Sequence, residues 1–239
     1  MCLYRNKKRI DFRTEADWEE RQKLLKTAFP VDIRAVDARF DIQEGNMRRP
    51  ITRNTPWESA KFEVVAHKWV DLWETGYGMA VLNDCKYGHD IKEDTIRLTL
   101  IKSAVDPDYT ADLGHHEFTY SILPHHREWY RAEIEQEAFD LNNPLSGKPG
   151  KPVMEHSFIS FDRDAVVVDA VKKAENSDAI VIRFHEFKGS RETIKMQSAF
   201  NIRQWCECSL MEIPEGTFQE GPVEIFVKPY EIKTIMVNF

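Results

Sequence analysis

Apolar residues alternate with polar ones over much of this chain, and this period of two constrains the fold more than any other feature. In the run 96–100, an isoleucine and two leucines are separated by an arginine and a threonine. Successive side chains of a strand point to opposite faces of a sheet, so this alternation predicts a strand with one buried face. The same pattern recurs at 117–122, 194–196 and 222–227. The sequence therefore predicts an all-β protein.

Turn-forming residues separate the predicted strands. Gly, Pro, Asn, Asp and Ser gather at 75–78, 106–108, 176–178, 188–190 and 214–216. Antiparallel strands can be joined by such short turns, whereas a parallel sheet needs a long crossover, usually a helix, between its strands. The spacing of the turns therefore favours β-sandwiches.

Two segments could be helical. The segment 14–26 is rich in good helix formers, and 129–141 places Tyr130, Ile134 and Ala138 four residues apart. Each could equally be an extended segment with a charged outer face, so both alternatives stay open.

The clearest break in the pattern is the segment 142–152, which holds three prolines and two glycines. Proline has no backbone N–H to donate, so this composition sustains neither a strand ladder nor a helix. We place a linker or long loop at 144–152. It separates a larger predicted domain at 1–143 from a smaller one at 153–239, both of ordinary domain size.

Charge and hydropathy exclude some classes of partner. The net charge of the 239-residue chain is -7, and no basic stripe is present that could neutralise a phosphate backbone. No apolar run approaches the roughly 20 residues that a membrane-spanning helix needs. The N-terminus shows no apolar stretch of the kind found in signal peptides. We therefore expect neither a nucleic-acid partner nor a membrane.

The cysteines and histidines do not form a recognisable metal or redox motif. Cys206 and Cys208 are two residues apart, which is not the CxxC spacing of a zinc or redox site. Four cysteines in a chain of this length are typical of unpaired thiols in a reducing cytoplasm. The histidines occur as two adjacent pairs and four isolated residues, with no HxH or HExxH spacing: His115–His116, His125–His126, His67, His89, His156 and His185.

The segment 80–90 is the most informative candidate for a binding site. It begins as a short apolar strand and continues into a loop that contains Asn83, Asp84, Lys86 and Tyr87. Carboxylate or amide groups beside an aromatic ring suit a sugar, which has both hydroxyls and an apolar face. The plainer interpretation is a strand-end turn in which Asn83 or Asp84 bonds the backbone.

The tryptophans also admit two interpretations. Several of them could stack on sugars: Trp57, Trp69, Trp73, Trp129 and Trp205. Trp69, however, lies in the strand-like run 64–70, where packing in a core is the better interpretation.

A series of motifs along the chain resembles the C-terminal region of glycoside hydrolase family 38 α-mannosidases, and it is most similar to the cytosolic and bacterial branch. The matching motifs cover nearly the whole chain in the order of the family: RIDF at 9–12, KLLK at 23–26, FPV at 29–31, RNTPW at 53–57, KFEVVAHKWVDL at 61–72, GYG at 76–78, LNDCKYG at 82–88, ADLGHHEFTYSILPH at 111–125, VKKAE at 171–175 and EIKT at 231–234.

The resemblance implies a fold and a place in a larger enzyme. Enzymes of this family are retaining exo-mannosidases with an N-terminal β/α domain that holds zinc and an Asp nucleophile. A helical bundle and β-sandwich domains follow, including a mutarotase-like supersandwich. The residues 1–143 would be a supersandwich portion and 153–239 a smaller β-sandwich. No zinc ligand or nucleophile has a counterpart here, so the resemblance implies no cofactor in this chain. Zinc, or another divalent metal, is expected in the N-terminal catalytic domain.

The resemblance also implies where substrate would lie. Loops of the supersandwich close one side of the family's cleft, and six residues would lie nearest to it, orienting substrate without doing chemistry: Asp84, Lys86, Tyr87, His115, His116 and His125. The expected partners are mannose-containing glycans and the catalytic domain of the same enzyme, with a homo-oligomer possible, and the chain alone would be inactive. Two alternatives stay open, an independent carbohydrate-binding module and a structural or oligomerisation domain.

Overall fold

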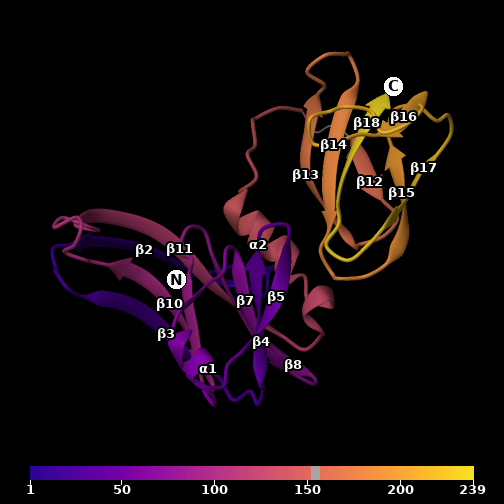
Figure 1. Cartoon of the computed structure of the whole chain (residues 1–239). Coiled ribbons are helices and arrows are strands. Elements are labelled where there is room, and N and C mark those ends of the chain that lie inside the picture. The colour runs from indigo at the N-terminus through magenta and orange to yellow at the C-terminus, as the bar shows by residue number, and fades with distance from the viewer. Residues whose placement is uncertain (152–156) are drawn as a thin grey trace. The chain divides into compact units, whose positions relative to one another are not determined.

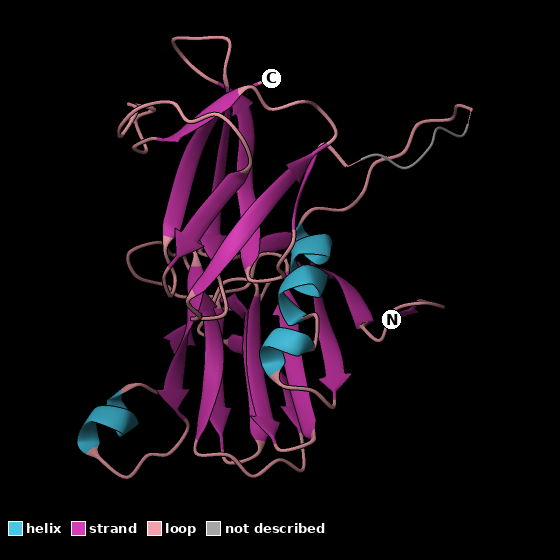
Figure 2. Ribbon diagram, turned by 90° about the vertical axis from the view of Figure 1, so that its right-hand side faces the viewer, coloured by secondary structure: helices cyan, strands magenta, loops and turns pink. Residues whose placement is uncertain are grey.

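The chain folds into two compact units, Met1–Gly147 and Lys148–Phe239 (Figure 1). The computed structural model describes residues 1–151 and 157–239. The division between the units falls inside the range 144–152. Pro152, His156 and the first residues of the predicted smaller domain lie outside the described residues. Strands dominate both units and helices are few (Figure 2), so the predicted all-β class is confirmed.

The larger unit is a sandwich of two sheets with antiparallel strand pairs. The seven-stranded sheet contains, in spatial order, β1 (Cys2–Leu3), β2 (Ile10–Trp18), β11 (Gly114–His125), β8 (Tyr77–Asn83), β7 (Trp69–Glu74), β4 (Asp37–Ile42) and β5 (Gly45–Pro50). The four-stranded sheet contains β3 (Leu24–Pro30), β10 (Thr95–Lys102), β9 (Gly88–Lys92) and β6 (Val64–Val65).

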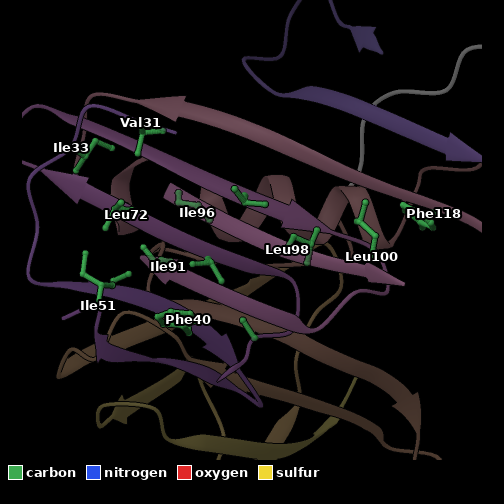
Figure 3. Close-up of a cluster of buried hydrophobic side chains, with 14 of the residues drawn as sticks. Val31, Ile33, Phe40, Ile51, Leu72, Ile91, Ile96, Leu98, Leu100 and Phe118 are labelled. Atoms are coloured by element: carbon green, nitrogen blue, oxygen red, sulfur yellow. The ribbon is translucent and has the colours of Figure 1, made fainter. Parts of the chain in front are cut away.

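Apolar side chains from both sheets meet in a single core (Figure 3). On β10 the predicted alternation is confirmed, because Ile96 and Leu98 are fully buried while Arg97 between them is only half-buried. Phe40 and Leu72 from the other sheet join the same cluster. Burial of each such side chain stabilises the fold by about 1.5–3 kcal/mol, so this core fixes which face of each strand points inward.

The segment 14–26 is extended, not helical. Most of its first half belongs to β2, where Ala16 and Trp18 pack against the core while Glu15 and Asp17 are exposed. Its last residues begin β3. The packing of one face of β2 outweighs the helix propensity of its charged residues, which amounts to only tenths of a kcal/mol each.

The segment 129–141 is largely helical. It forms a 3-10 turn, η1 (Trp129–Arg131), and then α2 (Ile134–Asn142), which lies against β7 and β8. The buried residues Ile134 and Ala138 are four apart and therefore share one face of the helix. Trp129 stacks on Trp69 of β7 at 5.6 Å between ring centroids. A third helix, α1 (Pro56–Ala60), begins at the N-cap Thr55 and buries no residue.

The smaller unit is a second sandwich of antiparallel pairs around its own core. One sheet has the order β12 (Ile159–Phe161), β15 (Glu192–Ser198) and β17 (Val223–Val227). The other has the order β13 (Val166–Lys173), β14 (Ile180–Glu186), β18 (Ile232–Asn238) and β16 (Gln204–Glu207). The alternation of Val223, Ile225 and Val227 is confirmed, since all three are buried between exposed neighbours.

Candidate functional site

The loop between β8 and β9, residues 84–87, is shaped by the side chain of Asn83. Asn83 is completely buried, and its Oδ1 accepts a hydrogen bond of 2.6 Å from the backbone N–H of Lys86. Its Nδ2 donates to the carbonyl oxygen of His67 at 2.8 Å. From α2, the Nδ2 of Asn142 donates to the carbonyl of Asn83 at 3.0 Å. This asparagine therefore closes the turn and ties it to the strand entry and the helix beside it.

Asp84 fastens the loop to the neighbouring strand β11. Its Oδ2 accepts a 2.8 Å hydrogen bond from the backbone N–H of Thr119, while its own N–H donates to the carbonyl of Thr119 at 3.1 Å. Its Oδ1 is buried and has no hydrogen-bond partner among the described residues. The plainer interpretation, in which Asn83 or Asp84 bonds the backbone, is thus confirmed for both residues. Asp84 also keeps one oxygen whose hydrogen-bonding capacity is unused.

Cys85 and Tyr87 of the loop are exposed residues, whereas Lys86 between them is half-buried. Tyr87 is 52% exposed, and its ring lies 5.3 Å from the imidazole of His67. The Nζ of Lys86 lies 4.6 Å from the centroid of the Phe118 ring, in a cation–π contact. Partial burial of the Cys85 thiol group, followed by its interaction with the Asp84 carboxylate, raises the pKa of the thiol to about 11. Cys85 is therefore a neutral thiol at ordinary pH and not an activated nucleophile.

His115 and His116 lie farther along β11 from the loop. Thr119, which Asp84 bonds, is four residues from His115, which corresponds to about 13 Å along a strand. His115 bonds Asp17 through Nδ1 at 2.8 Å and Glu117 through Nε2 at 3.2 Å. The hydrogen bond with Asp17, and to a smaller extent that with Glu117, raises the pKa of His115. His116 donates from Nε2 to the carbonyl of Asp112 at 2.9 Å.

His125 lies at the opposite end of β11, where it pairs with Gly78. Its side chain is 4% exposed, and both ring nitrogens are bonded: Nδ1 to the carbonyl of Arg127 and Nε2 to Oδ1 of Asp71, each at 2.8 Å. Neutral histidine carries a hydrogen on only one ring nitrogen, whereas both nitrogens of His125 face oxygen acceptors. Hydrogen bonds at both nitrogens therefore require one additional proton, which His125 and Asp71 share. His125 thus has no free ring nitrogen to offer a ligand.

The pKa values of this pair agree with the geometry. Burial would lower the pKa of His125, but the hydrogen bond and charge of Asp71 outweigh it, and the net shift is upward. Burial raises the pKa of the completely buried Asp71 carboxyl. Both shifts keep the proton in the pair.

The structure therefore brings together three of the six predicted residues, Asp84, Lys86 and Tyr87. It separates them from His115 and His116 on one side and from His125 on the other. Sequence reasoning missed the partners Thr119 and Asn142, because they come from segments distant in the chain. The buried asparagine directly before the aspartate was the available signal for a shaped turn.

Two of the tryptophans that could have stacked on sugars differ in their exposure to solvent. Trp69 is fully buried, so its predicted packing role is confirmed, whereas Trp57 is 78% exposed on α1.

Within the described residues, no three His, Cys, Asp or Glu side chains converge in a way that could hold a metal ion. The described part of the chain also contains no helix that is both long and apolar enough to cross a bilayer.

Comparison with known proteins identifies the family. The model of the glycosyl hydrolases family 38 C-terminal domain matches residues 1–110, and that of the family 38 C-terminal β-sandwich domain matches residues 165–235. The chain belongs to glycoside hydrolase family 38. It carries C-terminal domains of that family, as the motifs in the sequence predicted, and the predicted family membership is confirmed.

Two curated relatives of this family 38 chain are α-mannosidases by name. Human α-mannosidase 2C1 is 36% identical over 238 residues, and α-mannosidase G of Dictyostelium discoideum is 39% identical over 245 residues. These alignments cover 95% and 98% of the chain but only 23% and 22% of the relatives. The chain therefore spans less than a quarter of their length.

Solved structures support the fold alone. An α-mannosidase from Enterococcus faecalis V583 superposes with a TM-score of 0.81 over 99% of this chain and 28% of the other, at 18% sequence identity. A larger sandwich followed by a smaller one is therefore a fold that this chain shares with a solved α-mannosidase.

Proposed function

We propose that this chain is the C-terminal, non-catalytic part of an α-mannosidase, and that its larger unit lines one side of the substrate cleft. The names of the relatives support the activity, and the short share of their length that the chain covers supports a part of a larger enzyme. The observation that carries the cleft role is the 84–87 loop, a fixed turn that exposes an aromatic ring beside charged groups.

The loop suits recognition of a neutral sugar. The half-exposed ring of Tyr87 offers an apolar surface to a pyranose and a hydroxyl at its end. The unused Oδ1 of Asp84 offers an acceptor for a sugar hydroxyl once the turn shifts slightly to expose it. Lys86, held over Phe118, supplies a donor beside them. These groups would orient a terminal mannosyl residue and leave bond cleavage to residues outside this chain.

The metal of such an enzyme does not fit the residues of this chain that the structure describes. A zinc site needs three or four convergent ligands, and the described residues offer no such group. We assign zinc, or another divalent ion, to an N-terminal catalytic domain of the same polypeptide. We assign no reaction step that involves the metal to the residues of this chain.

The compartment and partners follow from the same proposal. All four cysteines are unpaired, which suits a reducing cytoplasm. Mannose-containing glycans would be the substrates, and the catalytic domain would be the principal partner.

Kinetics of loop variants in the full-length enzyme test the proposal. Tyr87→Ala should raise KM or lower kcat for an aryl α-mannoside, with a loss of about tenfold in kcat/KM, equivalent to about 1.4 kcal/mol. Asp84→Asn keeps an oxygen for the N–H of Thr119 but removes the charge, and should lower kcat/KM without lowering the melting temperature.

Tyr77→Ala is the matched control, because Tyr77 is also a partly exposed tyrosine, 39%, but lies at the turn between β7 and β8. It should leave the kinetics unchanged. Unchanged kinetics in Tyr87→Ala and Asp84→Asn, with normal folding, would remove the cleft role and leave a purely structural domain.

A further inference from the structure

The first part of the connection between β16 and β17 exposes three large apolar side chains to water. Leu210, Met211 and Ile213 are 61%, 80% and 64% exposed. None of them belongs to either of the two buried apolar clusters found among the described residues of the smaller unit. We call residues 208–214 the apolar loop.

The single charged residue of the apolar loop points the other way. The side chain of Glu212 is only 9% exposed, and its carboxylate accepts hydrogen bonds of 2.8 Å from the Nζ of Lys172 and from the backbone N–H of Glu175. Its backbone adopts a left-handed conformation, with φ of 62°, which is unfavourable for a residue other than glycine. The ordinary arrangement of a surface loop, with charge outward and apolar groups inward, is thus inverted.

Hydrogen bonds hold the apolar loop in this conformation. The backbone N–H of Ser209 donates to the carbonyl of Ile213 at 2.9 Å, and the N–H of Glu212 donates to the carbonyl of Ser209 at 2.9 Å. The Nη2 of Arg183, on β14, donates to the carbonyl of Leu210 at 3.2 Å. A fixed loop that exposes neighbouring apolar side chains is typical of an interaction surface, since such residues lose little entropy on docking.

The size of the surface indicates what it binds. Three side chains of this kind bury about 200–350 Å² in total, whereas a stable complex of separate proteins buries about 800 Å² on each partner. The apolar loop is therefore too small to hold a second copy by itself. A partner tethered in the same polypeptide meets an effective concentration in the millimolar range, at which a small contact suffices.

We propose that the apolar loop docks on an apolar surface of the same polypeptide outside residues 1–239. The chain spans only 23% of human α-mannosidase 2C1 and 22% of α-mannosidase G of Dictyostelium discoideum, so most of a polypeptide of that kind lies outside it. This inference rests on the proposed function only in requiring that the chain is part of a longer enzyme.

Met211 is a natural reporter of docking, because peroxide oxidises exposed methionines. The rate of its oxidation should be measured by mass spectrometry in the full-length protein, in the 239-residue chain, and in both after unfolding with guanidinium. We expect at least a tenfold slower rate in the folded full-length protein than in the folded chain, and equal rates after unfolding. Equal rates in the two folded proteins would overturn the proposal.

Protection of Met211 in the 239-residue chain alone would also overturn the proposal. If that protection grew with concentration, the partner would be a second copy, and if it did not, the partner would lie within residues 1–239.

A variant separates docking from folding. Leu210→Asp should lower the melting temperature of the full-length protein by several degrees, yet leave that of the 239-residue chain unchanged. Val36→Asp, at an apolar residue of the larger unit that is 71% exposed, is the matched control and should change neither. An equal effect of Leu210→Asp in both proteins would contradict docking. If Tyr87→Ala left the kinetics of the full-length enzyme unchanged while Met211 was still protected, the result would contradict the proposed function and not the docking.

Discussion

His89 is a buried histidine whose environment makes the larger unit sensitive to acid. It is completely buried on β9, and its Nδ1 lies 3.3 Å from the carbonyl oxygen of Tyr87. Its Nε2 has no hydrogen-bond partner in the part of the chain that the structure describes. Burial lowers its pKa to about 4 from the ordinary value of 6.5. In the folded state the ring therefore stays neutral between these values, while in the unfolded state it gains a proton.

The magnitude follows from this difference in protonation. Stability from a neutral buried histidine is fully present above pH 6.5 and is lost as pH falls toward the folded value of about 4. The pKa of His89 differs between the unfolded state, at 6.5, and the folded state, at about 4. At about 1.4 kcal/mol per pKa unit, this difference corresponds to about 3 kcal/mol in the free energy of unfolding. His89→Leu removes the titrating group. We expect it to change the free energy of unfolding by about 1 kcal/mol or less at pH 7, because it loses one long hydrogen bond and one unsatisfied nitrogen.

Urea unfolding at a series of pH values between 7 and 4 measures this effect. Tryptophan fluorescence follows the larger unit, since Trp205 is the only tryptophan outside it. The wild-type chain should lose about 3 kcal/mol more than His89→Leu over this range. His126→Leu, at an exposed histidine, is the control and should follow the wild type. Parallel losses in the wild type and His89→Leu would refute the reasoning.

The remaining predictions concern the pair of Asp71 and His125. A Cβ added at Gly78 would lie 2.2 Å from Cε1 of His125 and 2.9 Å from Cβ of Trp73, so Gly78→Ala should cost about 1–3 kcal/mol in urea unfolding. The added substitution His125→Ala should partly relieve this cost, and purely additive losses would count against the clash. The raised pKa of His125 means that its contribution to stability is present below pH 6.5 and is lost as pH rises through the raised value. Asp71→Asn should abolish that alkaline loss, and an unchanged pH profile would argue against the shared proton.

The fold was predictable where one face of a strand is buried. The alternation at Ile96 and Leu98 sets the inner face of β10, and packing in the core enforces it. The segment 14–26 was ambiguous because its charged residues favour a helix, while the apolar residues of β2, Ala16 and Trp18, pack only through tertiary contacts. A local sequence window does not contain the surface against which such residues pack.

The candidate site was predictable only in part, for the same reason. Asp84, Lys86 and Tyr87 are neighbours in sequence, so a loop that carries all three was visible directly. The separation of His125 from them depends on the register of β11 against β8, in which Tyr120 lies opposite Asn83. Register is set by long-range pairing and not by composition, so a motif that spans both ends of a strand does not reveal which residues meet.

We propose that this chain shapes a mannosidase cleft but holds no catalytic centre. The most direct measurement is hydrolysis of a nitrophenyl α-mannoside by the purified 239-residue chain and by the full-length protein, each supplied with zinc. We expect turnover by the full-length protein and none above the buffer rate by the chain alone. Metal-dependent turnover by the chain alone would contradict it.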